Sequence, residues 1–593
     1  MPLGQIHHRC CAILATLLVV GFGGCIRPGP LEWIDEQADR VIEHRQILTL
    51  GPQPAAGVNV PLLPSGEPDA VGDQIYDIDP ATNNPTAESL VIEQMDPSDP
   101  ETTMADPAFD PAALEQAETV QMNLEQVLEY AIANAPEYRD RKEDLYLATL
   151  ALIVERHLWG ARFFNTLTTK VGGAPESGDH DQVYEILNEF VVTQRLPYGG
   201  SVAAGAMVNY VNYLQQSATS TASSSDSLGA ELSASIDLPL LRGAGQAARG
   251  SLIQAERDLI YAVRDFERFR RTFFVDIANT YFGLIRRMAQ IENRQLQVQN
   301  LERLADRFLA LAEAGRVPFF EAEQSQSNVL LEGSDLIIEQ DRSRLDLDAF
   351  KATLGMPTIS NLELVPSEVI VPLLRLEPER AIDTAFRYRL DLQTSSDRID
   401  DARREVKDAK NKLLPDLDLF GSISLPTDSD RDTVEDFDSG DGQYEAGMRL
   451  GSPLDREIEI SDYRAAWIGL ERARRSHNVF RDQVALEVRR SIREIRQARI
   501  NLELNQRGVQ VNERRERAVQ LRERTLGPRD VIEAQEDLLD ARNRRDQALA
   551  ELRQSVLRHL LDTGQMRISS EGRWLSPGQL AQPAAKPMPA AMP

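Results

Sequence analysis

The chain has 593 residues and a formal net charge of −28, from 65 basic and 93 acidic side chains. This length exceeds that of one ordinary compact domain, so we expect several domains or a highly elongated one. The excess of negative charge would repel a phosphate backbone, which argues against nucleic acid as a partner.

The chain begins with a predicted export signal, residues 1–24. His7 and Arg9 precede a short apolar run at residues 10–20, and small residues lead to Cys25. This layout is typical of a secretory signal and is too short for a membrane-spanning helix. A cysteine at the cleavage point resembles the bacterial lipoprotein signal, in which the thiol is acylated, so Cys25 is a predicted lipidation site. A plain cleaved signal is the alternative. In lipoproteins an aspartate after the cysteine favours the inner membrane, so Ile26 favours the outer membrane.

Residues 25–121 form a predicted flexible, acidic spacer. No lysine or arginine occurs between Gln46 and Tyr138, and the middle of this stretch is rich in proline, acidic residues, glycine and alanine. Such a composition buries too little apolar surface to offset chain entropy. We expect only a short helix here, near Trp33 to Leu48, and a divalent-cation site made of the carboxylates is the functional alternative. A second, Pro/Ala-rich tail is predicted at residues 566–593.

Two related units lie between these tails, at residues 122–357 and 375–565. The span from Glu321 to Gly355 aligns without gaps with the span from Asp530 to Gly564. Each unit is expected to contain a helix, strands, a long helix, a short turn and another helix. The long helices are predicted at residues 250–314 and 458–524, and a heptad pattern along the first indicates a coiled coil. A purely structural coiled coil would explain this pattern equally well.

Four short segments alternate between apolar and polar residues, at residues 202–210, 228–238, 417–425 and 444–450. Segments of this kind are typical of outer-membrane barrel strands, although soluble sandwiches alternate too. Four strands cannot close a barrel, since the smallest bacterial barrels use about eight. A barrel would therefore need several copies of the chain. A further segment, residues 186–197, could be extended, but its place is not assigned.

From Asn123 to about Gly564 the chain resembles the TolC family of outer-membrane efflux and secretion ducts. The resemblance rests on the order of several motifs: the opening with Asn134, Pro136 and Glu137; the strand ending at residues 238–243 with its echo at 451–454; the Tyr281 helix; and the turn at Ala314 and Gly315. It implies a mainly α fold with a membrane β-barrel, in which each copy of a homotrimer gives four strands to a 12-stranded barrel and its helices to a periplasmic α-barrel.

The same resemblance implies a passive, lipid-anchored outer-membrane duct that extends into the periplasm. Its partners would be outer-membrane lipid, a periplasmic adaptor and an inner-membrane pump, in a tripartite efflux pump or a type I secretion system. The turn that matches the adaptor-contacting tip consists of Gly315, Arg316, Val317 and Pro318. The second tip, with Gly527, Pro528 and Arg529, is three residues shorter than the family pattern.

Asp530 and Glu533 match the acidic positions near the closed periplasmic constriction of this family. Three copies of such carboxylates in a narrow pore would attract cations and repel anions. The alternative is that Asp530 caps the last helix and Glu533 completes a capping box.

Enzymatic functions are not expected. The five histidines after Cys25 are scattered without metal-ligand spacing, and no P-loop sequence is present. We therefore predict no catalytic residues, cofactor or metal. The competing function is a structural periplasmic coiled-coil lipoprotein without channel activity, which has no need of four alternating strands. The exported substrate is not predicted.

Overall fold

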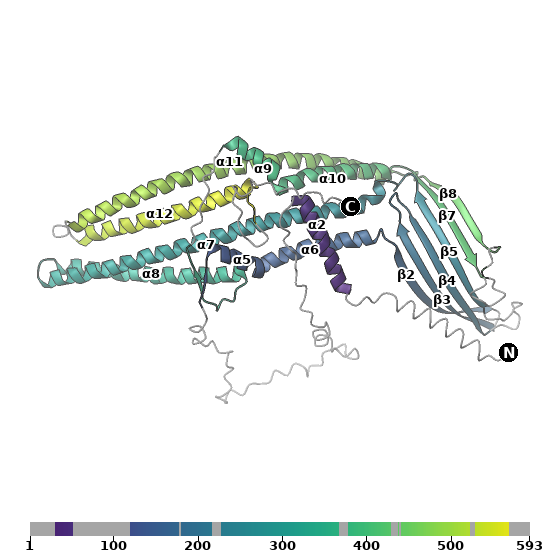
Figure 1. Cartoon of the computed structure of the whole chain (residues 1–593), viewed down its shortest axis with the longest axis horizontal. Helices are drawn as coiled ribbons and strands as arrows, with labels where there is room; N and C mark the ends of the chain where they lie inside the picture. Colours follow the sequence, from purple (N-terminus) through teal and green to yellow (C-terminus); the bar gives the residue numbers. More distant parts are fainter. Residues whose placement is uncertain are drawn as a thin grey trace, which may run out of the picture.

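The computed structural model describes residues 30–50, 119–176, 179–215, 227–366, 377–427, 437, 440–521 and 528–568. The predicted signal peptide, Cys25, Gly527 and most of the predicted spacer and tail lie outside these residues. The molecule is elongated, with a curved sheet at one end and two long helical hairpins reaching to the other (Figure 1).

The first half of the fold runs up to the sheet and back. Its elements are α2 (Pro30–Leu50), β1 (Val120–Met122), α5 (Leu124–Asn134), α6 (Pro136–His157), β2 (Arg162–Glu176), β3 (Asp179–Arg195), β4 (Ser201–Gln215), β5 (Ser227–Pro239), α7 (Gly250–Glu313), α8 (Phe319–Leu354) and β6 (Leu362–Leu364). The predicted helix near Trp33 to Leu48 is thus present as α2. It packs on α6 and α7, where Ala38 and Ile42 are buried and Arg45 pairs with Glu256 at 3.2 Å.

The second half has the same order with fewer strands. Its elements are α9 (Pro378–Tyr388), α10 (Leu390–Lys412), β7 (Asp416–Pro426), β8 (Gln443–Gly451), α11 (Glu457–Leu521) and α12 (Pro528–Asp562). The two predicted long helices are confirmed as α7 and α11, of 64 and 65 residues. Neither contains proline, which would remove a backbone hydrogen bond of the helix and kink or break it.

Local sequence explains where the shorter helices begin and end. Asn123 caps α5 through a capping box with Gln126, in which each side chain accepts from the other residue's backbone N–H. Ala135 is extended between α5 and α6, as expected for a residue before proline, and Pro136 opens α6. In the second half Arg389, also extended, separates α9 from α10.

The large sheet has the strand order β2-β3-β4-β5-β7-β8, and all its neighbours are antiparallel. The four predicted strands are confirmed as β4, β5, β7 and β8, but the sheet has six strands rather than four. Residues 186–195 of the unassigned segment belong to β3. The missed strand, β2, has Asn165 and Thr169 on its more apolar face, which obscures the alternation. A second, two-stranded sheet pairs β1 with β6 in parallel.

The largest core lies midway along the molecule, where the ends of α8 and α12 meet α5, α6 and α7. Tyr281, Phe350 and Leu354 are almost fully buried there. In the described parts of the chain, no helix is both long enough and apolar enough to cross a membrane.

Candidate functional site: a two-faced sheet and paired helical hairpins

Across its six strands the large sheet has one predominantly apolar face and one more polar face. One row of paired residues is entirely apolar and consists of Phe163, Val192, Ala204, Ala234, Ile423 and Tyr444. The next row lies on the opposite face, because adjacent residues of a strand point to opposite sides. It is mostly polar and consists of Arg162, Thr193, Ala203, Ser235, Ser422 and Glu445. This alternation is typical of an outer-membrane barrel wall, with lipid on one side and water on the other, and it also occurs in soluble sandwiches.

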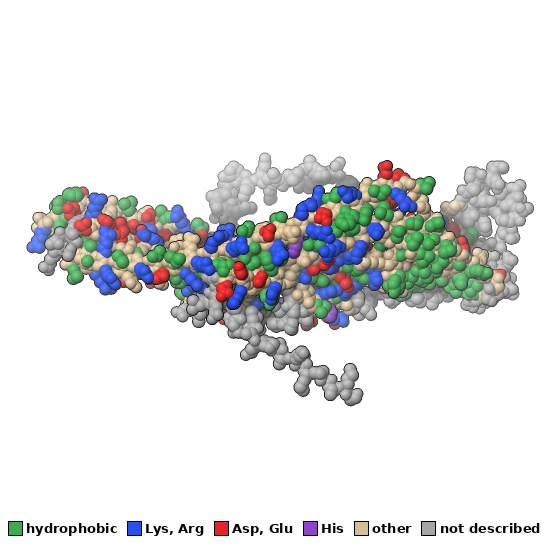
Figure 2. All heavy atoms as spheres, turned by 90° about the horizontal axis from the view of Figure 1, so that it is seen from above, with side chains coloured by type: hydrophobic (Ala, Val, Ile, Leu, Met, Phe, Trp, Pro, Cys, Tyr) green, Lys and Arg blue, Asp and Glu red, His purple; other side chains and the backbone are tan. Residues whose placement is uncertain are grey.

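Many side chains on the apolar face are exposed in the described part of the single chain. Phe163 is 66% exposed, Ile423 60% and Tyr444 86%. Figure 2 shows hydrophobic side chains gathered over the strand end of the molecule, whereas charged side chains are spread over the helices. An apolar patch of this extent on a protein surface marks a contact with lipid or with another protein.

The sheet also has two unpaired edges. β2 pairs only with β3, and β8 only with β7, among the strands of the described chain. An open strand edge presents a row of free backbone donors and acceptors, and such edges do not occur in contact with lipid. The edges must therefore be paired by another chain if this sheet enters a membrane.

The two hairpins are joined along a coiled-coil seam. In α7 Leu301, Phe308 and Ala312, which belong to the heptad pattern of this helix, are buried in a cluster that also contains Val531 and Ile532 of α12. Large apolar side chains remain exposed on the other helices of the hairpins. They include Leu330, Leu331, Ile337 and Leu345 of α8 and Leu486, Ile500, Leu504 and Val511 of α11.

The first hairpin tip has the short reversal expected from the sequence. Gly315 has a φ of 67°, in the left-handed region that favours glycine, and the backbone N–H of Arg316 donates to the carbonyl of Leu311 at 2.9 Å. Pro318 precedes α8, and Val317 packs against the seam cluster. In the second tip Pro528 is the first residue of α12 and Arg529 is exposed.

The two predicted constriction carboxylates lie in the first two turns of α12, near the tip. Asp530 is exposed and is the third residue of the helix, where a negative charge interacts favourably with the helix dipole. Glu533 makes an ion pair with Arg515 of α11, with an Oε1 to Nη2 distance of 3.1 Å. Asp537, one turn further on, pairs with the same guanidinium. Arg515 thus sets how much negative charge this side of the tip presents.

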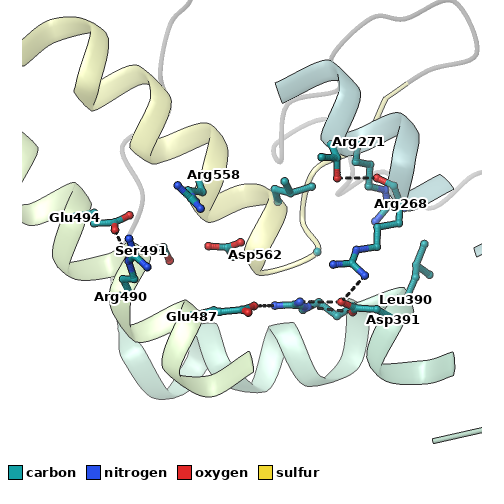
Figure 3. A pocket seen from close by; sticks show the side chains of 14 residues that line it. Arg268, Arg271, Leu390, Asp391, Glu487, Arg490, Ser491, Glu494, Arg558 and Asp562 are labelled. Atoms are coloured by element: carbon teal, nitrogen blue, oxygen red, sulfur yellow. Dashed lines mark hydrogen bonds and ion pairs between the residues drawn. The ribbon is translucent and has the colours of Figure 1, made fainter. Parts of the chain in front are cut away.

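A charged pocket, not predicted from the sequence, lies where α7, α10, α11 and α12 meet (Figure 3). At its base the Arg389 guanidinium binds both carboxylate oxygens of Asp391, at 3.1 and 2.8 Å, and Glu487 at 2.5 Å. Arg268 of α7 reaches the same Asp391 at 3.1 Å. The ion-pair network therefore ties the first half of the fold to the second. Arg268 and Glu487 are far in sequence from Arg389 and Asp391, so no local spacing could have predicted the whole network.

The charges of this pocket have shifted pKa values. Burial alone would raise the pKa of Asp391, but the hydrogen bonds and charge of Arg389 outweigh it and hold that pKa below its usual value. Burial raises the pKa of Asp562 to about 6, although Arg389 and Arg558 oppose the shift. Burial also lowers the pKa of His559 to about 4. The His559 ring nitrogen Nδ1 lies 2.8 Å from the Ser491 hydroxyl, so this side chain is packed as a neutral group.

No protein-family model matches the chain. No curated protein matches it either. Solved structures do. The outer membrane protein VceC from Vibrio cholerae is 16% identical, with a TM-score of 0.56 over 74% of this chain and 96% of VceC. The CmeC outer membrane channel from Campylobacter jejuni is 14% identical, with a TM-score of 0.56 over 74% of this chain and 85% of CmeC.

CusC, described as forming a transmembrane channel, is 11% identical, with a TM-score of 0.56 over 76% of this chain and 94% of CusC. At these identities the likeness establishes the fold. The chain therefore has the mainly helical, sheet-ended fold of the TolC-like outer-membrane channels.

Proposed function

We propose that this protein is the outer-membrane channel of a tripartite efflux pump or a type I secretion system. It acts as a passive duct, and the energy for transport comes from an inner-membrane partner. The observation that carries the proposal is the two-faced sheet at the end of the long helical hairpins. A structural coiled-coil rod would not need a sheet with one predominantly apolar, exposed face.

The working form in this proposal is a homotrimer in the outer membrane. The edges of β2 and β8, unpaired among the described strands, support it, because a sheet edge in a membrane needs a backbone partner and strands of neighbouring chains can supply one. The exposed apolar side chains of α8 and α11 support it too, because neighbouring hairpins would bury them. Acylation of Cys25 would add a lipid anchor, at roughly 0.8 kcal/mol for each buried methylene.

The tips of the hairpins are the proposed contact with a periplasmic adaptor. At the first tip the contact would be made by Gly315, Arg316, Val317 and Pro318, and at the second by Gly527, Pro528 and Arg529. Arg316 and Arg529 would supply positive charge on this surface, since both residues are exposed near the hairpin tips.

The proposed constriction lies beside the second tip. In a trimer, Asp530 and Glu533 would each be present three times around the axis and would favour cations over anions. Asp530 is exposed, so its charge is available to the pore, whereas Arg515 partly offsets the charge of Glu533.

The test is single-channel conductance of the purified protein in planar lipid bilayers. Wild type is compared with the double variant Asp530→Ala/Glu533→Ala and with a control, Asp341→Ala, which removes an exposed acid from α8. We expect a cation-selective pore that becomes less selective and more conductive only in the double variant. If the double variant has the same selectivity and conductance as wild type, the channel function is supported and the acidic constriction is rejected. Absence of conductance, together with a Cys25→Ala protein that stays soluble without detergent, would support the coiled-coil rod instead.

A further inference from the structure

The sheet of each chain contains six strands, two more than the four expected from the sequence. The two additional strands, β2 and β3, have one more apolar face and one more polar face, as strands of a membrane barrel do. β2 and β3 pair over 15 residue pairs, and β3 pairs with β4 over 14, so the additional hairpin is continuous with the rest of the sheet. The Phe163, Leu167 and Val171 side chains of β2 are 66%, 48% and 70% exposed on the apolar face. On the opposite face Lys170 pairs with Glu185 of β3 at 3.8 Å.

The hairpin is also fixed at the end of the sheet that adjoins the helices. β3 turns tightly into β4, and the backbone N–H of Leu196 donates to the carbonyl of Gly200 at 3.0 Å. The carbonyl of Tyr198 in this turn accepts from the backbone N–H of Gly245, at 2.8 Å, in the segment that leads into α7. The additional strands therefore start at the same level as the others rather than projecting from the rim of the sheet.

An arrangement in which β2 and β3 lie outside the barrel wall would be unfavourable for two reasons. β4 would lose its pairing with β3 and would need another partner on that edge. The apolar face of β2 and β3 would also be exposed to water or would lie against the outside of a neighbouring copy. The register instead aligns the apolar residues of β3 with those of β4 and β5, so that they form one continuous surface. Keeping the strands in the wall avoids both problems, because lipid covers the apolar face and a neighbouring chain pairs the edge of β2.

We propose that every chain contributes all six strands to the membrane wall and that β2 of one copy pairs with β8 of the next. Six strands from each of three copies give a barrel of 18 strands, whereas four from each would give 12. This inference rests on the proposed trimeric channel. Because barrel diameter grows about linearly with strand number, the wall would be roughly half again as wide as one of 12 strands. The membrane end would then admit bulky solutes, and the helical end would set the size limit.

Cysteine cross-linking between copies tests which strand pairs with β8. Glu445→Cys in β8 is combined with a cysteine at Thr166 or Lys170 in β2, or with Ala203→Cys in β4, all on the polar face. The membrane-embedded protein is treated with a bifunctional maleimide, and covalent oligomers are separated in denaturing gels. Glu445→Cys alone controls for reaction at the native cysteines. We expect dimers and trimers from the β2 combinations only.

Covalent oligomers from the β4 combination alone would overturn the six-strand wall while leaving the trimeric channel intact. Absence of oligomers from every combination, in a protein that is monomeric in detergent and does not conduct, would overturn the channel itself. Counting barrel strands by electron cryo-microscopy of the unmodified protein provides a test without cysteine variants: 18 strands support the inference and 12 reject it.

Discussion

Gly355, just after α8, lies directly against the backbone carbonyl of Asn134 at the end of α5. A Cβ atom on Gly355 would come within 2.3 Å of that oxygen. The second half of the fold repeats the contact, since a Cβ on Gly564, just after α12, would lie 2.8 Å from the carbonyl of Tyr388 at the end of α9. In the first half the end of α8 thus contacts the junction between α5 and α6. In the second half the end of α12 contacts the junction between α9 and α10.

This contact predicts that Gly355→Ala destabilises the protein. Gly355 has a φ of 74°, so an alanine would be strained even without the collision. We expect a loss of about 2 kcal/mol or more, seen as a lower melting temperature of the detergent-solubilised oligomer. Gly283→Ala is the matched control, because this glycine is inside α7 and no atom beyond the adjoining turns of its own helix backbone lies within 4 Å of its Cβ position. It should leave the melting temperature unchanged or raise it. Equal effects of the two variants would contradict the prediction.

A buried carboxylate in α7 should be essential for folding. Glu267 is 2% exposed and pairs with Arg270 and Arg271, each at 2.9 Å. Glu267→Gln would remove the carboxylate charge that pairs with both buried guanidinium groups, so we expect a loss of about 3–5 kcal/mol and little assembled oligomer. The control is Glu471→Gln, which breaks an exposed pair with Arg474 and should change stability by less than about 1 kcal/mol. Normal assembly of the Glu267 variant would refute this expectation.

The parts of the fold that follow from local pattern were predictable from the sequence. The long helices follow from proline-free amphipathic runs, and β4, β5, β7 and β8 follow from strict alternation. β2 was missed because Asn165 and Thr169 interrupt its alternation, and only pairing with β3 places it in the sheet. The seam between α7 and α12 was half predictable, since the heptads identify the buried side of α7 but not the helix that covers it.

The candidate site divides in the same way. The acids near the tip were predictable because they lie close together at the start of one helix. The partner of Glu533 was not, because Arg515 comes from the other helix of the hairpin, and the two meet only once the chain has reversed. The pocket around Arg389 brings together four helices from both halves, and such a convergence leaves no mark in local sequence.

Arg515 should tune ion selectivity in the proposed pore. Its guanidinium faces both Glu533 and Asp537, so Arg515→Gln leaves these two carboxylates without that positive charge. We expect the reversal potential in a KCl gradient to shift toward stronger cation selectivity. Arg544→Gln is the control, because Arg544 forms an exposed pair with Asp540 further along α12. A shift of the same size in the control would mean that the tip has no special influence on the pore.

The pocket predicts a pH-dependent gain of stability in Asp562→Asn. Burial raises the pKa of Asp562 from 3.8 to about 6, so its stabilising contribution is complete below about pH 4 and is lost as the pH rises through 6. The neutral asparagine avoids this loss and should stabilise the protein by up to about 3 kcal/mol at pH 7.5. The gain should shrink as the pH falls to 4.5. His559 has the opposite dependence, since its lowered pKa removes stability in acid, but it is present in both proteins and cancels in their difference. The measurement is the melting temperature of each detergent-solubilised oligomer across this pH range, with Asp540→Asn as the exposed control. A gain that stays constant between pH 4.5 and 7.5 would show that ionisation of Asp562 does not destabilise the fold.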